Sequence, residues 1–416
     1  MKIKYPFIDL FAGCGGLSLG LELSGFTPVY VNELNNDALQ TYKINREDLK
    51  HLNENDFFSN NIFELTKNVK NLNKLEKNLK SKFGINKKDL ALVVGGPPCQ
   101  GYSGIGHRRN YKVNKDKIPS NFLYKEMVKV IEHFQPKAFI FENVRGLLSG
   151  RWSPEGKFGE IFKDVKNQFH KLKNYYQDFA LIECKNYGVP QNRPRVFIIG
   201  VRNDLNFKPN KNLVASGLLP EPDKSYPHPS ELLSDLIDDN YKKNFITKNY
   251  LRNPDTVFQK KLRTSKNNKS FLKKGDVLLD QEYSNHSPKI IDKFSYMIKN
   301  KGKIPDKYKT KKFAQRVLTE KWGIKGPNIT ATSLPDDYVH YSQPRSLTVR
   351  EWARLQMFPD WYKFSGKRTT GGIRRAGNPQ EGIWDREVPK YTQIGNAVPV
   401  ELARRIGKNL INKIKF

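Results

Sequence analysis

The sequence predicts an α/β protein with two domains, one inserted into the other. Over residues 1–202, short apolar segments alternate with helical patterns, which is typical of a sheet covered by helices. The alternation stops after residue 203, where the chain becomes rich in lysine and is interrupted by proline. Regular patterns return near residue 345. We therefore predict a main domain of residues 1–202 plus 341–416 and a smaller domain of residues 203–340, with the second boundary between 325 and 345.

Composition narrows the class of partner. The chain has 416 residues, with 73 Lys and Arg against 42 Asp and Glu, and a formal net charge of +31. Such a charge favours a polyanionic partner, and nucleic acid is the first candidate. The alternative is a lysine-rich composition that serves no target, because lysine is abundant throughout the chain.

The cysteines and the apolar runs indicate the compartment. Cys14, Cys99 and Cys184 lie far apart and form no CxxC pair, so neither a disulfide framework nor a structural zinc site is expected. The first residues lack the apolar run of a signal peptide. No segment approaches about 18 consecutive apolar residues. We therefore expect a cytoplasmic protein with no membrane span and no metal centre.

The first strand and the turn after it form a candidate cofactor cradle. A strand is expected over Tyr5–Phe11, and it contains Asp9. The glycine-rich turn Ala12–Gly16 follows, and then a helix over Leu17–Ser24. A glycine-rich turn before a helix N-terminus often holds a cofactor. Dinucleotide oxidoreductases use the same device, but the glycine spacing here is not GxGxxG.

An acidic residue follows the second strand. Phe26–Val31 reads as that strand, and Glu33 comes directly after it. A carboxylate at this place can accept hydrogen bonds from both hydroxyls of a ribose. The alternative is a solvated helix cap. Further on we expect helices over Asp37–Lys43 and Val69–Leu79, with a short strand before Ile62.

A buried strand delivers a cysteine to the same edge of the sheet. The apolar run Ala91–Val94 is ended by Gly-Gly-Pro-Pro, which places Cys99 on a sharp turn. In open α/β sheets ligands bind at the carboxyl edge, so this thiol is a candidate nucleophile. The alternative is a buried structural cysteine. The following stretch, residues 104–109, mixes glycine with positive charge and is expected to be a loop that closes over a phosphate backbone.

The middle of the chain adds an acid and two arginines. A helix over Leu123–Phe134 precedes a strand over Ala138–Phe141, which ends at Glu142. Two later strands are expected over Phe179–Cys184 and Val196–Val201. Arg193 and Arg195 stand between them, two residues apart. In a strand they would project to the same face. The alternative is a surface face of salt bridges.

The C-terminal part contains two helices. Thr348 is expected to cap the first, with Glu351 completing a capping box. Residues 366–389 are expected to be a glycine- and arginine-rich loop. The stretch Gln393–Pro399 leads into the final helix, Val400–Ile414.

Taken in order, these motifs resemble the DNA (cytosine-5)-methyltransferase family, in its prokaryotic restriction-modification type. Six stretches match the family's motifs in order, and together they are distributed over most of the chain outside 203–325. These are Phe7–Gly20 (cofactor loop), Pro98-Cys99-Gln100 (nucleophile), Glu142-Asn143-Val144 (acid), Gln191–Arg195 (paired arginines), Arg345–Gln356 (helix that supports the recognition domain) and Gln393–Pro399 (closing motif).

The resemblance implies a Rossmann-like fold that binds S-adenosyl-L-methionine. Phe11 would pack on the adenine, and Glu33 would bind the ribose. The family's acid for the adenine amino group is missing, and either Asn61 or Asp56 takes its place. The implied cofactor site contains Asp9, Phe11, Gly13, Gly15, Gly16, Leu17, Glu33, Asn61, Pro98, Asn396 and Val398.

The resemblance also implies a covalent mechanism. The Cys99 thiolate would add to position 6 of cytosine, because position 5 alone is a poor nucleophile. Glu142 would contact ring nitrogen N3, with its pKa raised by burial. Arg195 would hold the base O2 and favour the thiolate, while Arg193 braces the site.

The implied substrate is a flipped-out cytosine in a specific double-stranded DNA sequence. The loop Tyr102–Arg109 and the insert would fill the gap that the flipped base leaves in the DNA duplex. The insert would also read base edges, while its lysines contact phosphates. We expect a monomer in a bacterial or phage-infected cell, alongside a cognate restriction endonuclease. The alternatives are a tRNA cytosine-5 methyltransferase of the same fold, a DNA-binding protein with a decayed site, and an NAD-type oxidoreductase, in which Cys99 and the paired arginines would have no role.

Overall fold

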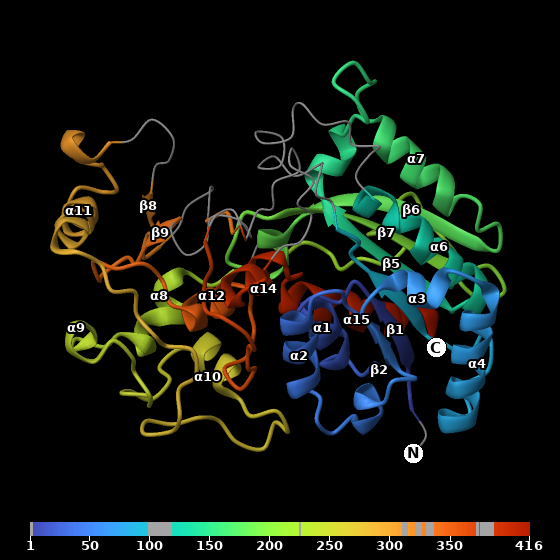
Figure 1. Ribbon diagram of the computed structural model, residues 1–416, viewed down its shortest axis with the longest axis horizontal. Helices are drawn as coiled ribbons and strands as arrows, with labels where there is room; N and C mark the ends of the chain where they lie inside the picture. Colours follow the sequence, from blue (N-terminus) through green and yellow to red (C-terminus); the bar gives the residue numbers. More distant parts are fainter. Residues whose placement is uncertain are drawn as a thin grey trace.

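A computed structural model describes residues 3–98, 119–223, 226–309, 315–321, 327–329, 337–371, 374 and 387–416. The predicted nucleophile Cys99 and the predicted loop Tyr102–Arg109 lie outside the described residues, as does most of the loop predicted over 366–389. Figure 1 shows the sheet together with its covering helices on the right of the view and a smaller group of elements on the left. The helices α12 (Val349–Leu355) and α14 (Lys390–Asn396) lie between them.

The main body is built on a seven-stranded mixed sheet of order β3-β2-β1-β4-β5-β7-β6. Its strands are β1 (Pro6–Leu10), β2 (Thr27–Asn32), β3 (Phe58–Ser59), β4 (Leu92–Gly95), β5 (Ala138–Val144), β6 (Tyr175–Glu183) and β7 (Pro194–Arg202). The first five run parallel, and β7 is antiparallel to both β5 and β6. The chain order reverses between β1 and β4, and such a switch point opens a ligand crevice at the carboxyl ends of the strands.

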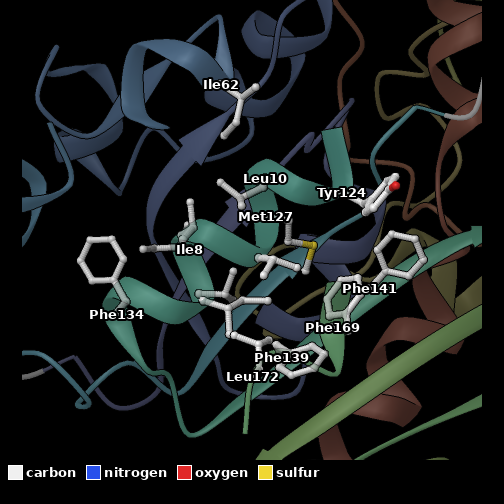
Figure 2. Packing of buried hydrophobic residues seen from close by; sticks show 14 of the residues in the cluster. Ile8, Leu10, Ile62, Tyr124, Met127, Phe134, Phe139, Phe141, Phe169 and Leu172 are labelled. Carbon is white, nitrogen blue, oxygen red and sulfur yellow. The ribbon is translucent and has the colours of Figure 1, made fainter. Parts of the chain in front are cut away.

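Helices cover both faces of the sheet. One face carries α3 (Ile62–Thr66), α4 (Val69–Phe83), α6 (Leu123–Phe134) and α7 (Glu160–Phe169). Figure 2 shows how Met127 of α6 packs among sheet residues such as Leu10 and Phe139. The other face carries α1 (Gly16–Glu22) and α15 (Val400–Ile414). These two helices touch so closely that a Cβ on Gly20 would lie 2.4 Å from the Cβ of Ala403, so the position requires glycine.

The predicted strands and helices of this body are present, with some differences. The helix α2 (Asn36–Ile44) and α15 follow the sequence closely. Strand β6 begins four residues earlier than predicted because Tyr175 already pairs with Arg202 of β7. Helix α7 was not predicted from the sequence, although Ile161, Val165 and Phe169 are spaced to form one buried helix face. Helix α14 was not predicted either.

The insert is formed by short helices and very short strands, as its irregular pattern suggested. Among the described residues, its helices are α8 (Pro229–Leu233), α9 (Tyr241–Asn244), α10 (Val257–Arg263) and α11 (Pro288–Lys299), and its strands are β8 (Arg316–Val317) and β9 (Tyr338–Val339).

Short 3-10 turns occur in both the main body and the insert, at Lys50–Asn53, Pro119–Phe122, Arg145–Ser149, Cys184–Tyr187, Ser234–Leu236 and Asp306–Tyr308.

Helix α12 joins the insert to the main body through buried charges. The predicted capping box is present: the Thr348 hydroxyl accepts from the Glu351 N–H, and the Glu351 carboxylate accepts from the Thr348 N–H. Arg354 is fully buried and pairs with Asp235 of the insert at 2.5 Å and with Asp360 at 2.6 Å. Asp235 also pairs with Arg263 of α10 at 3.0 Å. These pairs are shielded from water, so both partners must be present.

Replacing Asp235 by Ala should therefore destabilise the protein by about 3–5 kcal/mol, because two buried guanidinium groups lose a carboxylate. The matched control is Asp239→Ala, which removes an exposed partner of Arg252 at 3.6 Å and should change stability little. Urea denaturation followed by circular dichroism measures both variants. Equal midpoints for the two would contradict the structural importance of the buried pair.

Candidate active site

Parallel pairing brings four chain segments to one edge of the sheet. Leu10 at the end of β1 pairs with Asn32 of β2 and with Gly95 of β4, and Gly95 pairs with Phe141 of β5. The residues that directly follow these positions therefore meet at the carboxyl edge. They are the glycine-rich loop after β1, Glu33, the Gly-Gly-Pro-Pro segment and Glu142.

The glycine-rich loop is packed on one side and open on the other. The Gly13 N–H donates to Glu33 Oε2 at 2.8 Å. Among the described residues, apart from Gly13 and its chain neighbours, no atom lies within 4 Å of where a Gly13 Cβ would stand. Gly13 and Gly15 both have positive φ, +56° and +83°, which glycine adopts without strain. A Cβ on Gly16 would lie 2.4 Å from the carbonyl oxygen of Val398. The closing segment predicted from the sequence thus does return to this loop.

Glu33 belongs to the loop rather than to the helix behind it. Its two carboxylate oxygens accept from the N–H groups of Gly13 and Asn35, both at 2.8 Å. The cap of α2 is Asn35, whose side chain accepts from the Ala38 N–H, so the alternative interpretation of Glu33 as a helix cap does not hold. Burial raises the pKa of Glu33, while the two backbone N–H donors act in the opposite direction.

Other predicted cofactor residues lie around this loop at different depths. Phe11 is partly buried, with a positive φ of +56°, and packs against the core of the sheet. Asp9 is 1% exposed and accepts a hydrogen bond from Ser18 of α1, and burial raises its pKa to about 7. Leu17 and Val398 are buried in the core under α1, whereas Asn396 is exposed at the end of α14.

The structure separates the two candidates for the adenine contact. Asn61 follows β3 at the carboxyl edge, where its neighbour Asn60 donates to the Glu33 carbonyl oxygen at 3.2 Å. Asp56 precedes β3, at the amino end of the strand, and pairs with Lys74 at 3.0 Å. Asn61 already accepts from the Phe63 N–H at 3.1 Å, but an amide oxygen has a second lone pair. The geometry favours Asn61.

Glu142 and Arg195 form a buried pair at the end of β5. Arg195 Nε lies 2.7 Å from Glu142 Oε1, and each side chain is only 11% exposed. Burial raises the pKa of Glu142, against the opposing effect of the positive charges of Arg195 and Arg193. A Cβ on Gly96 would lie 2.9 Å from Glu142 Oε2, so the segment that leads toward Cys99 passes directly over this carboxylate.

Asn143 is a site residue to which the sequence analysis gave no role. Its side-chain amide donates to the Pro97 carbonyl oxygen at 3.1 Å, and its own Oδ1 accepts from the Val144 N–H. Pro97 and Pro98 line a shallow hollow together with Asn143 and Tyr124. The sequence signal that could have identified Asn143 was its position directly after Glu142, at the end of a predicted strand. Asn143 therefore holds the last described residues before Cys99.

The prediction that both arginines project from one strand is wrong for Arg193. Strand β7 begins at Pro194, so only Arg195 lies within it. The Arg193 guanidinium instead donates to the carbonyl oxygens of Gly395 and Ala397, both at 2.9 Å, and to that of Ile329 at 3.0 Å. A cation is favoured at a helix C-terminus. Arg193 thereby fixes the end of α14 near the glycine-rich loop.

The two described cysteines are poor candidates for a nucleophile. Cys14 and Cys184 are both free and buried, and burial raises the pKa of each thiol to about 12. A thiol must be ionised to attack, so these two stay inert near neutral pH.

Among the described residues, no group of three or more His, Cys, Asp or Glu side chains is arranged to hold a metal ion. Within the same part of the chain, no helix is long and apolar enough to cross a membrane.

Comparisons with known proteins define the class. The family described as C-5 cytosine-specific DNA methylase matches residues 5–412. The Type II methyltransferase M.DdeI of Desulfomicrobium norvegicum is 28% identical over 419 residues, which cover 97% of this chain and 88% of the relative. The Type II methyltransferase M.BspRI of Lysinibacillus sphaericus is 30% identical over 424 residues, which cover 98% and 81%.

Solved structures show the same fold. A putative DNA modification methyltransferase encoded within an E. coli prophage superposes with a TM-score of 0.67 at 22% identity, over 99% of this chain and all of its own. The Entamoeba histolytica methyltransferase EhMeth superposes with a TM-score of 0.56 at 14% identity, over 99% of each chain. The chain therefore belongs to the C-5 cytosine-specific DNA methylase family. It is a DNA (cytosine-5) methyltransferase.

Binding of the cofactor should depend on Glu33 more than on Asn61. Glu33 also holds the Gly13 N–H, so Glu33→Ala would remove the expected ribose-binding carboxylate and a support of the loop together. Calorimetry with S-adenosylmethionine should show the larger loss for Glu33→Ala and a smaller one for Asn61→Ala. Asp56→Ala is the control and should bind as the wild type does. A larger loss for Asn61→Ala than for Glu33→Ala would reverse this ranking.

Proposed function

We propose that this enzyme methylates carbon 5 of cytosine in a specific double-stranded DNA sequence, as the modification component of a restriction-modification system. Its relatives carry the name Type II methyltransferase, and its net charge of +31 suits DNA. The observation that carries the proposal is the buried Glu142–Arg195 pair beside the segment that leads to Cys99. The family and the relatives' names concern DNA, so they do not favour the tRNA alternative.

The residues of the carboxyl edge fit S-adenosyl-L-methionine as the cofactor. Gly13 leaves open space on one side of the loop, and Glu33 presents a carboxylate next to it. Asn61 offers an amide oxygen on the neighbouring strand end, and Pro98 is exposed beyond β4. When bound, this cofactor supplies an electrophilic methyl group on its sulfonium.

Cys99 is proposed as the nucleophile. Its thiolate would bond to carbon 6 of the cytosine, and the displaced electron pair would make carbon 5 nucleophilic toward the methyl group. Loss of the carbon-5 proton to a base then restores the double bond and expels the thiolate. The support is the sequence around Cys99 and the exclusion of the two described thiols, which are buried and protonated.

Glu142 and Arg195 are proposed to hold the base during this step. Negative charge develops at N3 as the thiolate adds, and a protonated Glu142 can donate to it. The raised pKa of Glu142 keeps its proton to higher pH than an exposed carboxyl would. Arg195 would contact the base O2 and lower the cost of forming the thiolate. Arg193 contributes through α14 rather than through the base.

The target base must leave the DNA stack to reach such a buried pair. We propose that residues 203–340 form the target-recognition domain, and that residues 1–202 plus 341–416 form the catalytic domain. The buried contacts of Arg354 with Asp235 support a fixed placement of the insert beside the catalytic edge. A cognate restriction endonuclease would recognise the same sequence.

Bisulfite sequencing of DNA from cells that express the protein tests the function and identifies the site. Duplex DNA with 5-fluorocytosine at that site should then form an adduct that survives denaturing electrophoresis, because fluorine cannot leave as a cation and the thiol stays bound. The adduct should require S-adenosylmethionine and be absent with Cys99→Ala. Cys184→Ala, which removes a buried thiol, is the control and should still be trapped.

The outcomes of this trapping experiment separate chemistry from substrate. An adduct with fluorinated tRNA and none with duplex DNA would replace DNA by tRNA as the substrate. If a preparation that methylates normal DNA forms no adduct with either, the covalent mechanism is wrong.

Replacing Glu142 by Gln should lower kcat by about 10²–10⁴, because an amide can donate a hydrogen bond but cannot give up a proton. The wild-type rate should also fall as pH rises through the raised pKa of Glu142, since the protonated form is then lost. The Gln variant has no such proton and should lack this decline. Single-turnover methylation across pH measures both, with the exposed Glu132→Gln as control. An unchanged pH profile in the Glu142→Gln variant would remove Glu142 from the acid role.

A further inference from the structure

The packed side of the glycine-rich loop rests on three side chains that the proposed mechanism does not use. A Cβ placed on Gly15 would lie 2.9 Å from the Tyr362 hydroxyl, 2.9 Å from Tyr42 Cδ2 and 3.0 Å from Arg46 Nη1. Tyr42 belongs to α2, Arg46 follows it, and Tyr362 follows α12. Two separate parts of the chain, the C-terminal end of α2 and the segment after α12, therefore lie against Gly15.

Arg46 is held in one orientation beneath the loop. It is 2% exposed, and its guanidinium lies 3.7 Å from the ring centre of Tyr42. Its Nε donates to Glu22 Oε1 at 2.9 Å, and its Nη1 donates to the Tyr42 carbonyl oxygen at 2.8 Å. Nη1 also donates to Tyr362 Oη at 3.3 Å, and Nη2 donates to Glu22 Oε1 at 2.5 Å and to the Gly15 carbonyl oxygen at 3.5 Å.

Tyr362 connects Arg46 to the neighbouring carbonyl of the loop. Its hydroxyl accepts from Arg46 and donates to the Cys14 carbonyl oxygen at 2.5 Å. Its own carbonyl oxygen accepts from Arg350 of α12 at 2.8 Å. Arg350 also donates to the Leu279 carbonyl oxygen of the insert at 3.1 Å. Arg350 of α12 therefore contacts both Tyr362 and the insert.

We propose that Tyr362 and Arg46 are positioning residues for cofactor binding. They hold the carbonyl oxygens of Cys14 and Gly15 on the packed side, while Glu33 holds the Gly13 N–H on the other. The loop is then in its binding conformation before the cofactor arrives. A loop with two glycines at positive φ would otherwise have to be ordered on binding, and ordering costs affinity. This inference rests on the proposed function, because it takes S-adenosylmethionine as the ligand.

The test is Tyr362→Phe, which removes one hydroxyl and keeps the ring. Calorimetry with S-adenosylhomocysteine should show a Kd about three- to tenfold higher than in the wild type, as expected for one buried hydrogen bond. The affinity of the cofactor-free protein for duplex DNA should not change. The KM for S-adenosylmethionine should rise, with kcat within about twofold.

A matched control separates positioning from general destabilisation. The buried Tyr175 hydroxyl donates to the Pro136 carbonyl oxygen at 2.6 Å, a bond of the same kind in a different part of the sheet. Tyr175→Phe should lower the melting temperature to a similar degree and leave the cofactor Kd unchanged. Arg46→Lys keeps the charge beside Glu22 but not the planar fork, so it should also weaken cofactor binding.

Equal cofactor Kd values for Tyr362→Phe and Tyr175→Phe would overturn the inference. If Tyr362→Phe does not fold, the same comparison between Arg46→Lys and Tyr175→Phe decides it. A wild-type protein that binds no S-adenosylhomocysteine would overturn the cofactor assignment and this inference together. A wild-type protein that binds it but methylates no DNA would overturn the proposed function alone.

Discussion

The structure depends on the parallel pairing of β1 with β2 and β4. Parallel strands end at the same edge, so the register that joins Leu10 to Asn32 and Gly95 also aligns whatever follows them. The glycine-rich loop, Glu33 and the Gly-Gly-Pro-Pro segment are far apart in the sequence, yet they meet there. The chain order reverses between β1 and β4, and such a switch point is where open α/β sheets bind their ligands. This edge is therefore the place at which the proposed cofactor and base would meet.

The second constraint is that three of the buried charges described above are each paired with an opposite charge. Glu142 with Arg195, Arg46 with Glu22, and Arg354 with Asp235 are all largely shielded from water. An isolated buried charge is costly, so each pair requires its partner to be in place. Burial raises the pKa of Glu142, and the nearby arginines offset only part of that effect. A raised pKa suits a carboxyl group that is proposed to donate a proton. At α12 the buried pair of Arg354 with Asp235 attaches the insert to the main body.

Support for the cofactor loop comes from late parts of the chain. Arg193 holds the end of α14, and the carbonyl oxygen of Val398 lies against Gly16. Tyr362 reaches the Cys14 carbonyl oxygen from the segment after α12. The loop is thus formed by the first strand but completed by residues more than three hundred positions away. The glycine-rich loop and the insert are consequently held by some of the same structural elements, which links the proposed cofactor site to the placement of the insert.

Much of the fold was predictable from the sequence, because strands, turns and capped helices are coded by local patterns. The helix α15, the capping box of Thr348 and the strand β5 that carries Glu142 all follow from such patterns, although β5 extends past Glu142 to Val144. The places of Asn61 and Asp56 at opposite ends of β3 were not predictable, because the bounds of this two-residue strand depend on its pairing with β2. Nor were the partners of Arg193, whose hydrogen bonds run to carbonyl oxygens some two hundred residues away. Local patterns determine which side chains stand at a strand end, but only the packing of distant segments decides what those side chains contact.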